Sequence, residues 1–152
     1  MYPFKKILCP TDFSEPSLCG LKMAKELATG HDTEIILLNV HKPIPHLPKP
    51  RQTASETTFD VSGYEQVIVE EAREQLRELQ EQIIGTEITT QVHVHMGSAD
   101  HEILAVAEEE QVDAICIATH GHTGLKKIVF GSVAQRVVRR APCPVITVRR
   151  CD

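Results

Sequence analysis

The feature that most constrains the fold is a regular alternation between short apolar runs and helical patterns. Segments 6–9, 34–40 and 114–118 are almost continuously apolar, which predicts strands that are covered on both faces. Segments 87–95 and 144–148 alternate apolar and polar residues, which is typical of edge strands. Helical periodicity separates one strand from the next. The sequence therefore predicts an α/β fold.

Capping signals give the expected helix boundaries. Ser14 predicts the N-cap of the first helix, and Gly30 predicts its end. Ser62 and Glu65 form a capping-box pattern that predicts the start of the longest helix, which should end at Gly85. Two shorter helical patterns precede the fourth and fifth strands.

Alternation of strands and helices implies a parallel sheet with right-handed crossovers. With the two alternating segments at the edges, the strand order is 3-2-1-4-5 in a three-layer, doubly wound, Rossmann-like sheet. The winding reverses between strands one and four, and ligands of such sheets bind in that crevice, outside the carboxyl ends of the strands. We expect one domain over residues 1–152, with the proline-rich segment 41–60 as a long, partly mobile loop.

Composition narrows the class of protein. The net charge of −5 argues against a general nucleic-acid binder, and no apolar stretch approaches the roughly 20 residues of a membrane span. The N-terminus has no secretory pattern. The five cysteines are odd in number and lack a CxxC pair, which favours free thiols in a reducing compartment. We therefore expect a cytoplasmic protein with neither nucleic acid nor membrane as partner.

Polar residues are expected to meet at the switch point. Pro10-Thr11-Asp12 follows the first strand, and a loop that begins at Thr119 follows the fourth. Gly131-Ser132 opens the last helix, where free N–H groups and the helix dipole favour phosphate. The carboxylate of Asp12 suits an amino or hydroxyl donor, so the pair indicates a nucleotide. Taken singly, Gly131-Ser132 also fits an ordinary helix start, and Asp12 fits a turn or cap.

The sequence resembles the universal stress protein family over essentially its whole length. The resemblance runs from KKILCPTDFSEPS through IILLNV to THGHTGLKKIVFGSVAQRVVRRAPCPVITVR. ATP-binding members of that family carry Gly, two residues, Gly, nine residues, and Gly followed by Ser or Thr. Here Gly121, nine residues and Gly131-Ser132 match the second half of the pattern, whereas Ala118 replaces the first glycine.

The resemblance implies a stress-response protein that binds ATP, with ADP or AMP as alternatives, and magnesium only as a companion of the phosphates. It also implies a homodimer paired through the last strand. Asp12 and the Val40 backbone would hold adenosine, and Gly97 would lie close to the ligand. Together, the switch point and the resemblance give these cofactor-binding residues: Pro10, Thr11, Asp12, Val40, Gly97, Ile117, Ala118, Thr119, His120, Gly121, His122, Gly131, Ser132 and Val133.

Fast turnover is not expected, and no catalytic residue is predicted. The chain has no GxxxxGK[ST] motif and no acidic residue beside the proposed phosphate cradle. Slow ATP hydrolysis or self-phosphorylation on Thr119 or Ser132 stays open. So does a nucleotide-free interaction module, which the replacement at Ala118 favours. A metal site is the remaining alternative, because His93 and His95 lie on one face of a strand.

Overall fold

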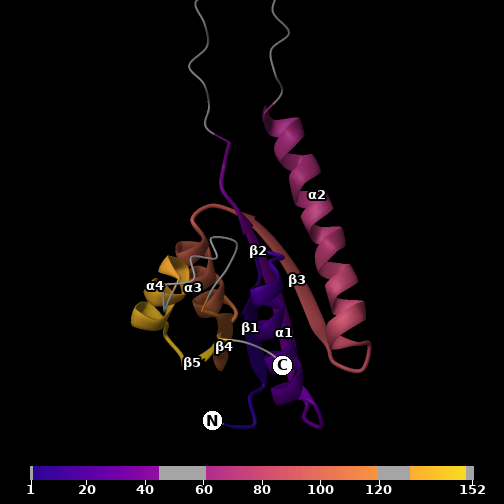
Figure 1. The fold of residues 1–152 in the computed structure, drawn as a ribbon, viewed down its shortest axis with the longest axis vertical. Helices are drawn as coiled ribbons and strands as arrows, with labels where there is room; N and C mark the ends of the chain where they lie inside the picture. Colours follow the sequence, from indigo (N-terminus) through magenta and orange to yellow (C-terminus); the bar gives the residue numbers. More distant parts are fainter. Residues whose placement is uncertain (1, 45–60, 120–130, 150–152) are drawn as a thin grey trace, which may run out of the picture.

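The computed structural model of the protein describes residues 2–44, 61–119 and 131–149. Five strands form one parallel sheet in the order β3-β2-β1-β4-β5, which confirms the predicted fold class and strand order. The elements in chain order are β1 (Lys6–Pro10), α1 (Glu15–Ala28), β2 (Glu34–His41), α2 (Val61–Leu79), β3 (Thr90–Met96), α3 (Ala99–Glu109), β4 (Ala114–Ala118), α4 (Ser132–Arg140) and β5 (Val145–Val148) (Figure 1).

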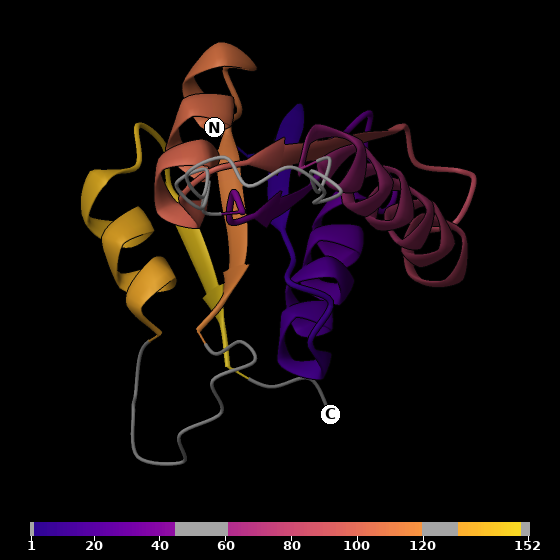
Figure 2. The same ribbon diagram turned by 90° about the horizontal axis from the view of Figure 1, so that it is seen from above.

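The sheet separates two layers of helices, with α1 and α2 on one face and α3 and α4 on the other (Figure 2). Each face has its own apolar core. Leu21 and Leu76 pack on the α1–α2 face, and Ile103 and Val137 pack on the α3–α4 face. Side chains of each strand alternate between the two cores.

Strand burial follows the predicted distinction between central and edge strands. Apart from Val40, the apolar positions of β1, β2 and β4 are buried, whereas every residue of β3 is partly exposed. Central strands are covered by helices on both faces, so their residues are apolar in succession. In β3, apolar and polar residues alternate because helices cover one of its faces less completely.

Several boundaries differ from the predictions. α2 begins at Val61, so Ser62 lies inside the helix and is not its N-cap; the Glu65 carboxylate instead accepts from the Ile44 N–H at 3.2 Å. β3 begins at Thr90 rather than at residue 87. A π-helical segment, Gln80–Ile84, prolongs α2 before the chain turns at Gly85, and β2 extends to His41, which takes that residue out of the predicted loop.

Ser14 is the N-cap of α1, as predicted, because its hydroxyl accepts a hydrogen bond from the Ser17 N–H. The helix ends at Ala28, and the chain then passes through Gly30 with φ of 78°, a left-handed conformation that favours glycine. The start of α1 therefore lies directly after the turn that carries Asp12.

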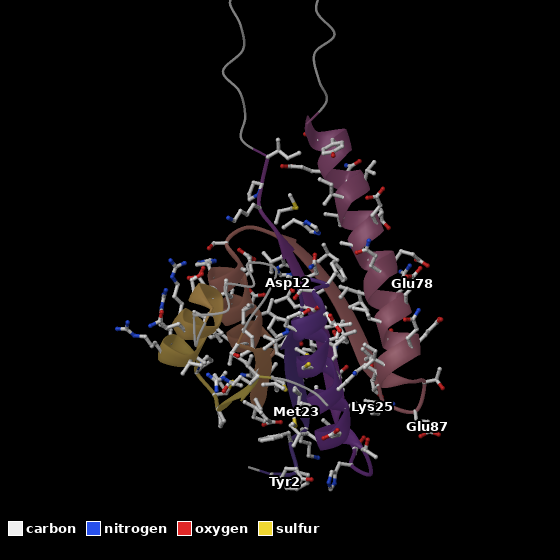
Figure 3. The ribbon with its side chains drawn as sticks, in the orientation of Figure 1. Tyr2, Asp12, Met23, Lys25, Glu78 and Glu87 are labelled. Carbon is white, nitrogen blue, oxygen red and sulfur yellow. The ribbon has the colours of Figure 1, made fainter. Side chains whose placement is uncertain are left out.

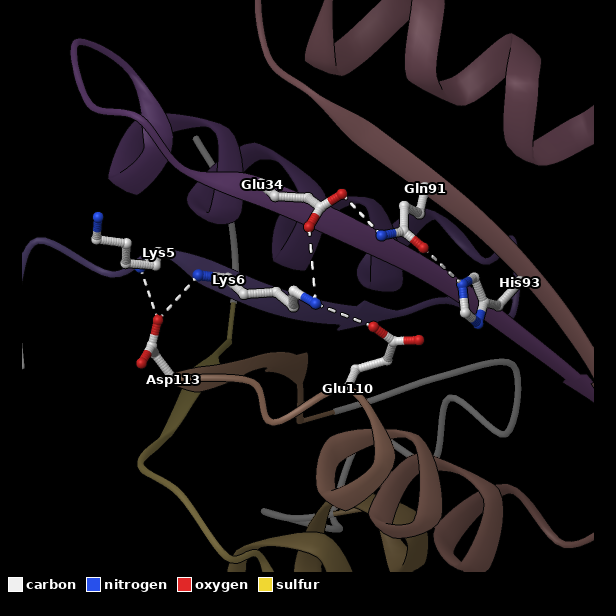
Figure 4. A network of polar contacts seen from close by, with 7 residues as sticks. All are labelled: Lys5, Lys6, Glu34, Gln91, His93, Glu110 and Asp113. Atoms are coloured by element: carbon white, nitrogen blue, oxygen red, sulfur yellow. Dashed lines mark hydrogen bonds and ion pairs between the residues drawn. The ribbon is translucent and has the colours of Figure 1, made fainter.

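A polar network secures the amino end of the sheet (Figure 4). The Lys6 ammonium lies 3.0 Å from a Glu110 carboxylate oxygen and 3.8 Å from one of Glu34. Asp113 accepts from the backbone N–H groups of Lys5 and Lys6 at 2.7 and 2.9 Å. The contact with Glu110 raises the pKa of Lys6 and lowers the pKa of Glu110. These charges stabilise the end of the sheet opposite the predicted site.

No helix in the described ranges is long and apolar enough to cross a membrane. Cys9, Cys116 and Cys143 carry free thiols, and burial raises the pKa of Cys116 to about 12. Cys116 is therefore an unreactive core residue at neutral pH. The expectation of free thiols is wrong at Cys19, which is disulfide-bonded.

Candidate functional site

A cavity of about 310 Å³ lies at the carboxyl ends of β1, β2 and β4, at the predicted switch point. Most of the described residues that the sequence assigned to the site line it. They are Pro10, Thr11, Asp12, Val40, Ile117, Ala118, Thr119, Gly131, Ser132 and Val133.

Other lining residues were missed. They are Ser17, Leu38, Lys42, Ala99, Ile103 and Ala134. Leu38 lies two residues before Val40, and Lys42 lies two residues after it. Side chains two residues apart in a strand face the same side, so this spacing could have predicted both residues. Ala99 and Ile103 are four apart on α3 and share one face. No local pattern places Ser17 at the cavity.

One predicted residue within the described ranges, Gly97, is not among those that line the cavity. His120, Gly121 and His122 lie outside the described residues. Gly97 is described and connects β3 to α3. A Cβ atom built on Gly97 would lie 2.5 Å from Oε1 of Glu102, so the space around this glycine is filled by a carboxylate of the protein itself.

The Val40 backbone faces the cavity because β2 is longer than β1. In a parallel strand, the N–H and C=O of one residue point to the same side, and those of the next residue point to the other. Leu38 accepts from the Thr11 N–H at 2.9 Å and so points toward β1, whereas His41 accepts from the Gly97 N–H at 2.7 Å and points toward β3. Val40 therefore points to the β1 side, beyond the last residue pair of β1 and β2. One donor and one acceptor are presented there side by side.

Asp12 sits in a tightly bonded turn after β1. The Ser14 N–H donates to Oδ1 of Asp12 at 3.1 Å, and the Ser14 hydroxyl donates to the same oxygen. The Phe13 N–H donates to the Thr11 hydroxyl at 3.1 Å, and Phe13 has φ of 63°, which is uncommon for a bulky residue. Tyr2, before β1, and Asp12, after it, lie toward opposite ends of that strand (Figure 3). Asp12 is thus held at the cavity by the fold.

The first turn of α4 borders the cavity on the side of β4. Gly131 is the N-cap residue, and its N–H donates to the Thr119 carbonyl at 2.6 Å. A Cβ atom on Gly131 would lie 3.0 Å from that carbonyl oxygen. Because α4 begins at Ser132, which lines the cavity with Val133, the positive end of its dipole lies at the cavity wall. This end suits an anionic group.

The Ala118 side chain faces away from the α3–α4 side of the sheet. Ile115 and Ile117 belong to the core under α3 and α4, whereas Cys116 belongs to the core under α1. Ala118 follows Ile117 in β4, so alternation directs its methyl group toward α1. A Cβ atom on Gly20 of α1 would lie 3.5 Å from the Ala118 nitrogen. The Ala118 methyl group, which the glycine of the family pattern lacks, therefore does not occupy the face of the sheet on which Ile117 borders the cavity.

The cavity wall combines apolar surface with two opposite charges. Leu38, Ile103 and Ile117 supply apolar surface, while Asp12 and Lys42 are the acidic and basic residues among the described lining. Apolar walls with a few placed polar groups are the usual composition of a small-molecule site. The lining suits an anionic molecule that also has an apolar part.

His93 and His95 contact each other and neighbouring residues within the described part of the chain. The rings of His93 and His95 stack with centroids 6.0 Å apart. No group of three or more His, Cys, Asp and Glu in the described ranges is arranged to hold a metal ion. Instead, Nδ1 of His95 lies 3.0 Å from a Glu102 carboxylate oxygen. These side chains therefore act as hydrogen-bonding partners within the protein.

Comparison with known proteins identifies the family. The model of the universal stress protein family matches residues 3–149. Universal stress protein MJ0531 of Methanocaldococcus jannaschii is 33% identical over 97% of this chain and 83% of that protein. Universal stress protein MJ0577 of the same organism is 30% identical over 97% and 96%. The chain belongs to the universal stress protein family.

Solved structures agree with this assignment. The structure of MJ0577 covers 97% of this chain and 97% of its own, with a TM-score of 0.79 and 29% identity. A universal stress protein family protein from Arabidopsis thaliana, solved with AMP bound, shares the fold with a TM-score of 0.61 at 18% identity, over 97% of this chain and 92% of that one. The Rossmann-like α/β fold is thus that of the family.

Proposed function

We propose that this universal stress protein binds an adenine nucleotide, ATP with ADP or AMP as alternatives, in the cavity at the ends of β1, β2 and β4. The observation that carries the proposal is the Val40 backbone, whose N–H and C=O face the cavity beyond the end of β1. Adenine presents a matching pair, the N1 acceptor beside the N6 donor. The AMP in the Arabidopsis structure, which shares the fold, supports the same class of ligand.

The remaining wall accommodates the rest of the nucleotide. Asp12, in its bonded turn, accepts from ribose hydroxyls or adenine N–H groups. The phosphates lie at the start of α4, where Gly131 has no side chain and Ser132 and Val133 present backbone N–H groups. Asp12 is the carboxylate among the described lining residues, and it is assigned to the nucleoside. No second carboxylate of the described lining is available to hold a metal, so magnesium is expected only as a companion of the phosphates.

The proposed activity is binding with little or no turnover. Efficient phosphoryl transfer needs carboxylates that hold the metal beside the phosphates and a group that positions water. The described start of α4 offers hydroxyl and backbone groups there. In the stress response the protein then acts as a nucleotide-occupied or nucleotide-free partner of other molecules.

Calorimetric titration with ATP–magnesium, GTP, AMP and cyclic AMP tests the proposal. We expect micromolar binding of ATP, about 8 kcal/mol, and much weaker binding of GTP. A parallel incubation that measures phosphate release should show no multiple turnover within minutes. Absence of heat with every nucleotide would instead favour the nucleotide-free interaction module.

A further inference from the structure

The carboxylate of Glu102, in the first turns of α3, bridges two histidines. Its Oε2 lies 3.0 Å from Nδ1 of His95 at the end of β3, and its Oε1 lies 3.3 Å from Nδ1 of His101. The hydrogen bond with His95, and then that with His101, hold the pKa of the Glu102 carboxyl below its usual range, although burial opposes this. Glu102 therefore fastens the start of α3 to β3.

The same carboxylate explains the glycine at position 97. A Cβ atom on Gly97 would lie 2.5 Å from Oε1 of Glu102 and 2.9 Å from its Cδ and Cγ. Gly97 is not among the glycines with positive φ, so a side chain there would be opposed by the space that Glu102 fills rather than by backbone conformation. An added side chain would displace the carboxylate, which sits at the end of a flexible side chain, and would break its contacts with the histidines.

This cluster connects two walls of the cavity. The Gly97 N–H donates to the His41 carbonyl at 2.7 Å, which ties the turn to the end of β2. On the other side, α3 contributes Ala99 and Ile103 to the cavity lining. Glu102 lies between Ala99 and Ile103 in α3, and its carboxylate occupies the space in which a Gly97 side chain would lie, so its position affects how α3 sits beside the turn that is tied to β2.

We propose that Glu102 is a positioning residue for the nucleotide cavity, and that Gly97 serves the nucleotide through Glu102 rather than by touching it. The proposal rests on the proposed adenine-nucleotide site. It differs from the role that the family resemblance implies for Gly97, which is proximity to the ligand. The two roles make opposite predictions for a double variant, because effects that pass through one carboxylate do not add.

The test is calorimetric titration of ATP–magnesium into wild type, Gly97→Ala, Glu102→Ala and the double variant, with thermal unfolding of each. We expect each single variant to weaken ATP binding by about five-fold and the double variant by the same factor, because all three lose one carboxylate contact. Glu102→Gln keeps the size and one acceptor oxygen, so it should bind with an intermediate affinity. Glu109→Ala, an exposed change on the same helix, should bind as wild type does.

A spectroscopic measurement separates positioning from general destabilisation. In an NMR titration, the pKa of the Glu102 carboxyl should lie below its usual range in wild type and return toward that range in Gly97→Ala, because the hydrogen bond with His95 is lost. The proposal would be overturned if the fold-losses of ATP affinity in the two single variants multiplied in the double variant. It would also be overturned if folded Glu102→Ala bound ATP as tightly as wild type. Either result would leave the nucleotide site itself intact. If wild type binds no adenine nucleotide, the proposed function fails, and this role of Glu102 fails with it.

Discussion

Replacement of Ala118 by glycine should lower stability without improving nucleotide binding. The family pattern has glycine at this position, which suggests that restoring glycine would open the site. Strand alternation gives the opposite expectation, because Cys116 packs toward α1, Ile117 packs toward α3 and α4, and the Ala118 methyl points toward α1. The methyl then belongs to the packing between β4 and α1, and its removal leaves the proposed nucleotide-facing side unchanged.

The loss of stability follows from burial and backbone freedom. Ala118 is 8% exposed, and removal of one buried methyl group costs about 0.8 kcal/mol. Glycine within a strand costs roughly 0.5–1 kcal/mol more through its freedom in the unfolded chain. The free energy of unfolding should therefore fall by about 1.5 kcal/mol, which lowers the Tm of a chain of this size by roughly 3–6 °C.

Ala114→Gly is the matched control, because Ala114 is fully buried on the same face at the other end of β4. Thermal unfolding should show similar losses for both variants, and calorimetry should show ATP affinities within about two-fold of wild type. A gain of about ten-fold in ATP affinity for Ala118→Gly alone would mean that its methyl narrows the site. The argument from strand alternation would then be wrong.

Three further predictions concern the site, the polar network and assembly. Gly131→Val should abolish ATP binding in calorimetry, since even a Cβ atom would lie 3.0 Å from the Thr119 carbonyl oxygen; retained binding would contradict the placement of the phosphates. Lys6→Met should cost about 1 kcal/mol at pH 7 in denaturant unfolding. The pKa of Glu110 is lowered in the folded state, so its contact with Lys6 contributes less stability as the pH falls below about 4.3 and through the folded pKa. The cost of Lys6→Met should therefore shrink at acid pH, and an equal cost at acid pH and at pH 7 would refute this prediction. Thr147→Pro removes an N–H that alternation places on the outer edge of β5, so sedimentation should show loss of the proposed homodimer with the fold kept, whereas a persisting dimer would exclude pairing through this edge.

The sheet could be predicted because its information is local. Continuous apolar runs marked the covered strands, and alternation marked β3, whose residues are all partly exposed. The cap at Ser14 was equally local, since its hydroxyl bonds a residue three positions away. The capping-box pattern at Ser62 failed because Glu65 meets the Ile44 N–H, a contact that only the folded chain provides. Local patterns predict where helices and strands lie, but they do not predict which distant backbone group a side chain such as Glu65 bonds.

The candidate site divides in the same way. Residues that follow strand ends, such as Asp12 and Thr119, were predicted because topology alone brings them together. Ser17 was missed, since it reaches the cavity through the packing of α1. The family resemblance implies that Gly97 lies close to the ligand, and only the folded chain shows that the Glu102 carboxylate fills the space beside it.

The unequal lengths of β1 and β2 have a consequence for how base recognition is encoded. Val40 presents its donor and acceptor to the cavity because β1 stops pairing at the level of Leu38. No side chain carries this contact, so replacing Val40 by isoleucine should alter the fit but keep the hydrogen bonds. A one-residue slip of β2 would instead turn the same groups toward β3. The proposed contact with the base therefore depends on the register of β1 and β2 and not on the side chain at position 40.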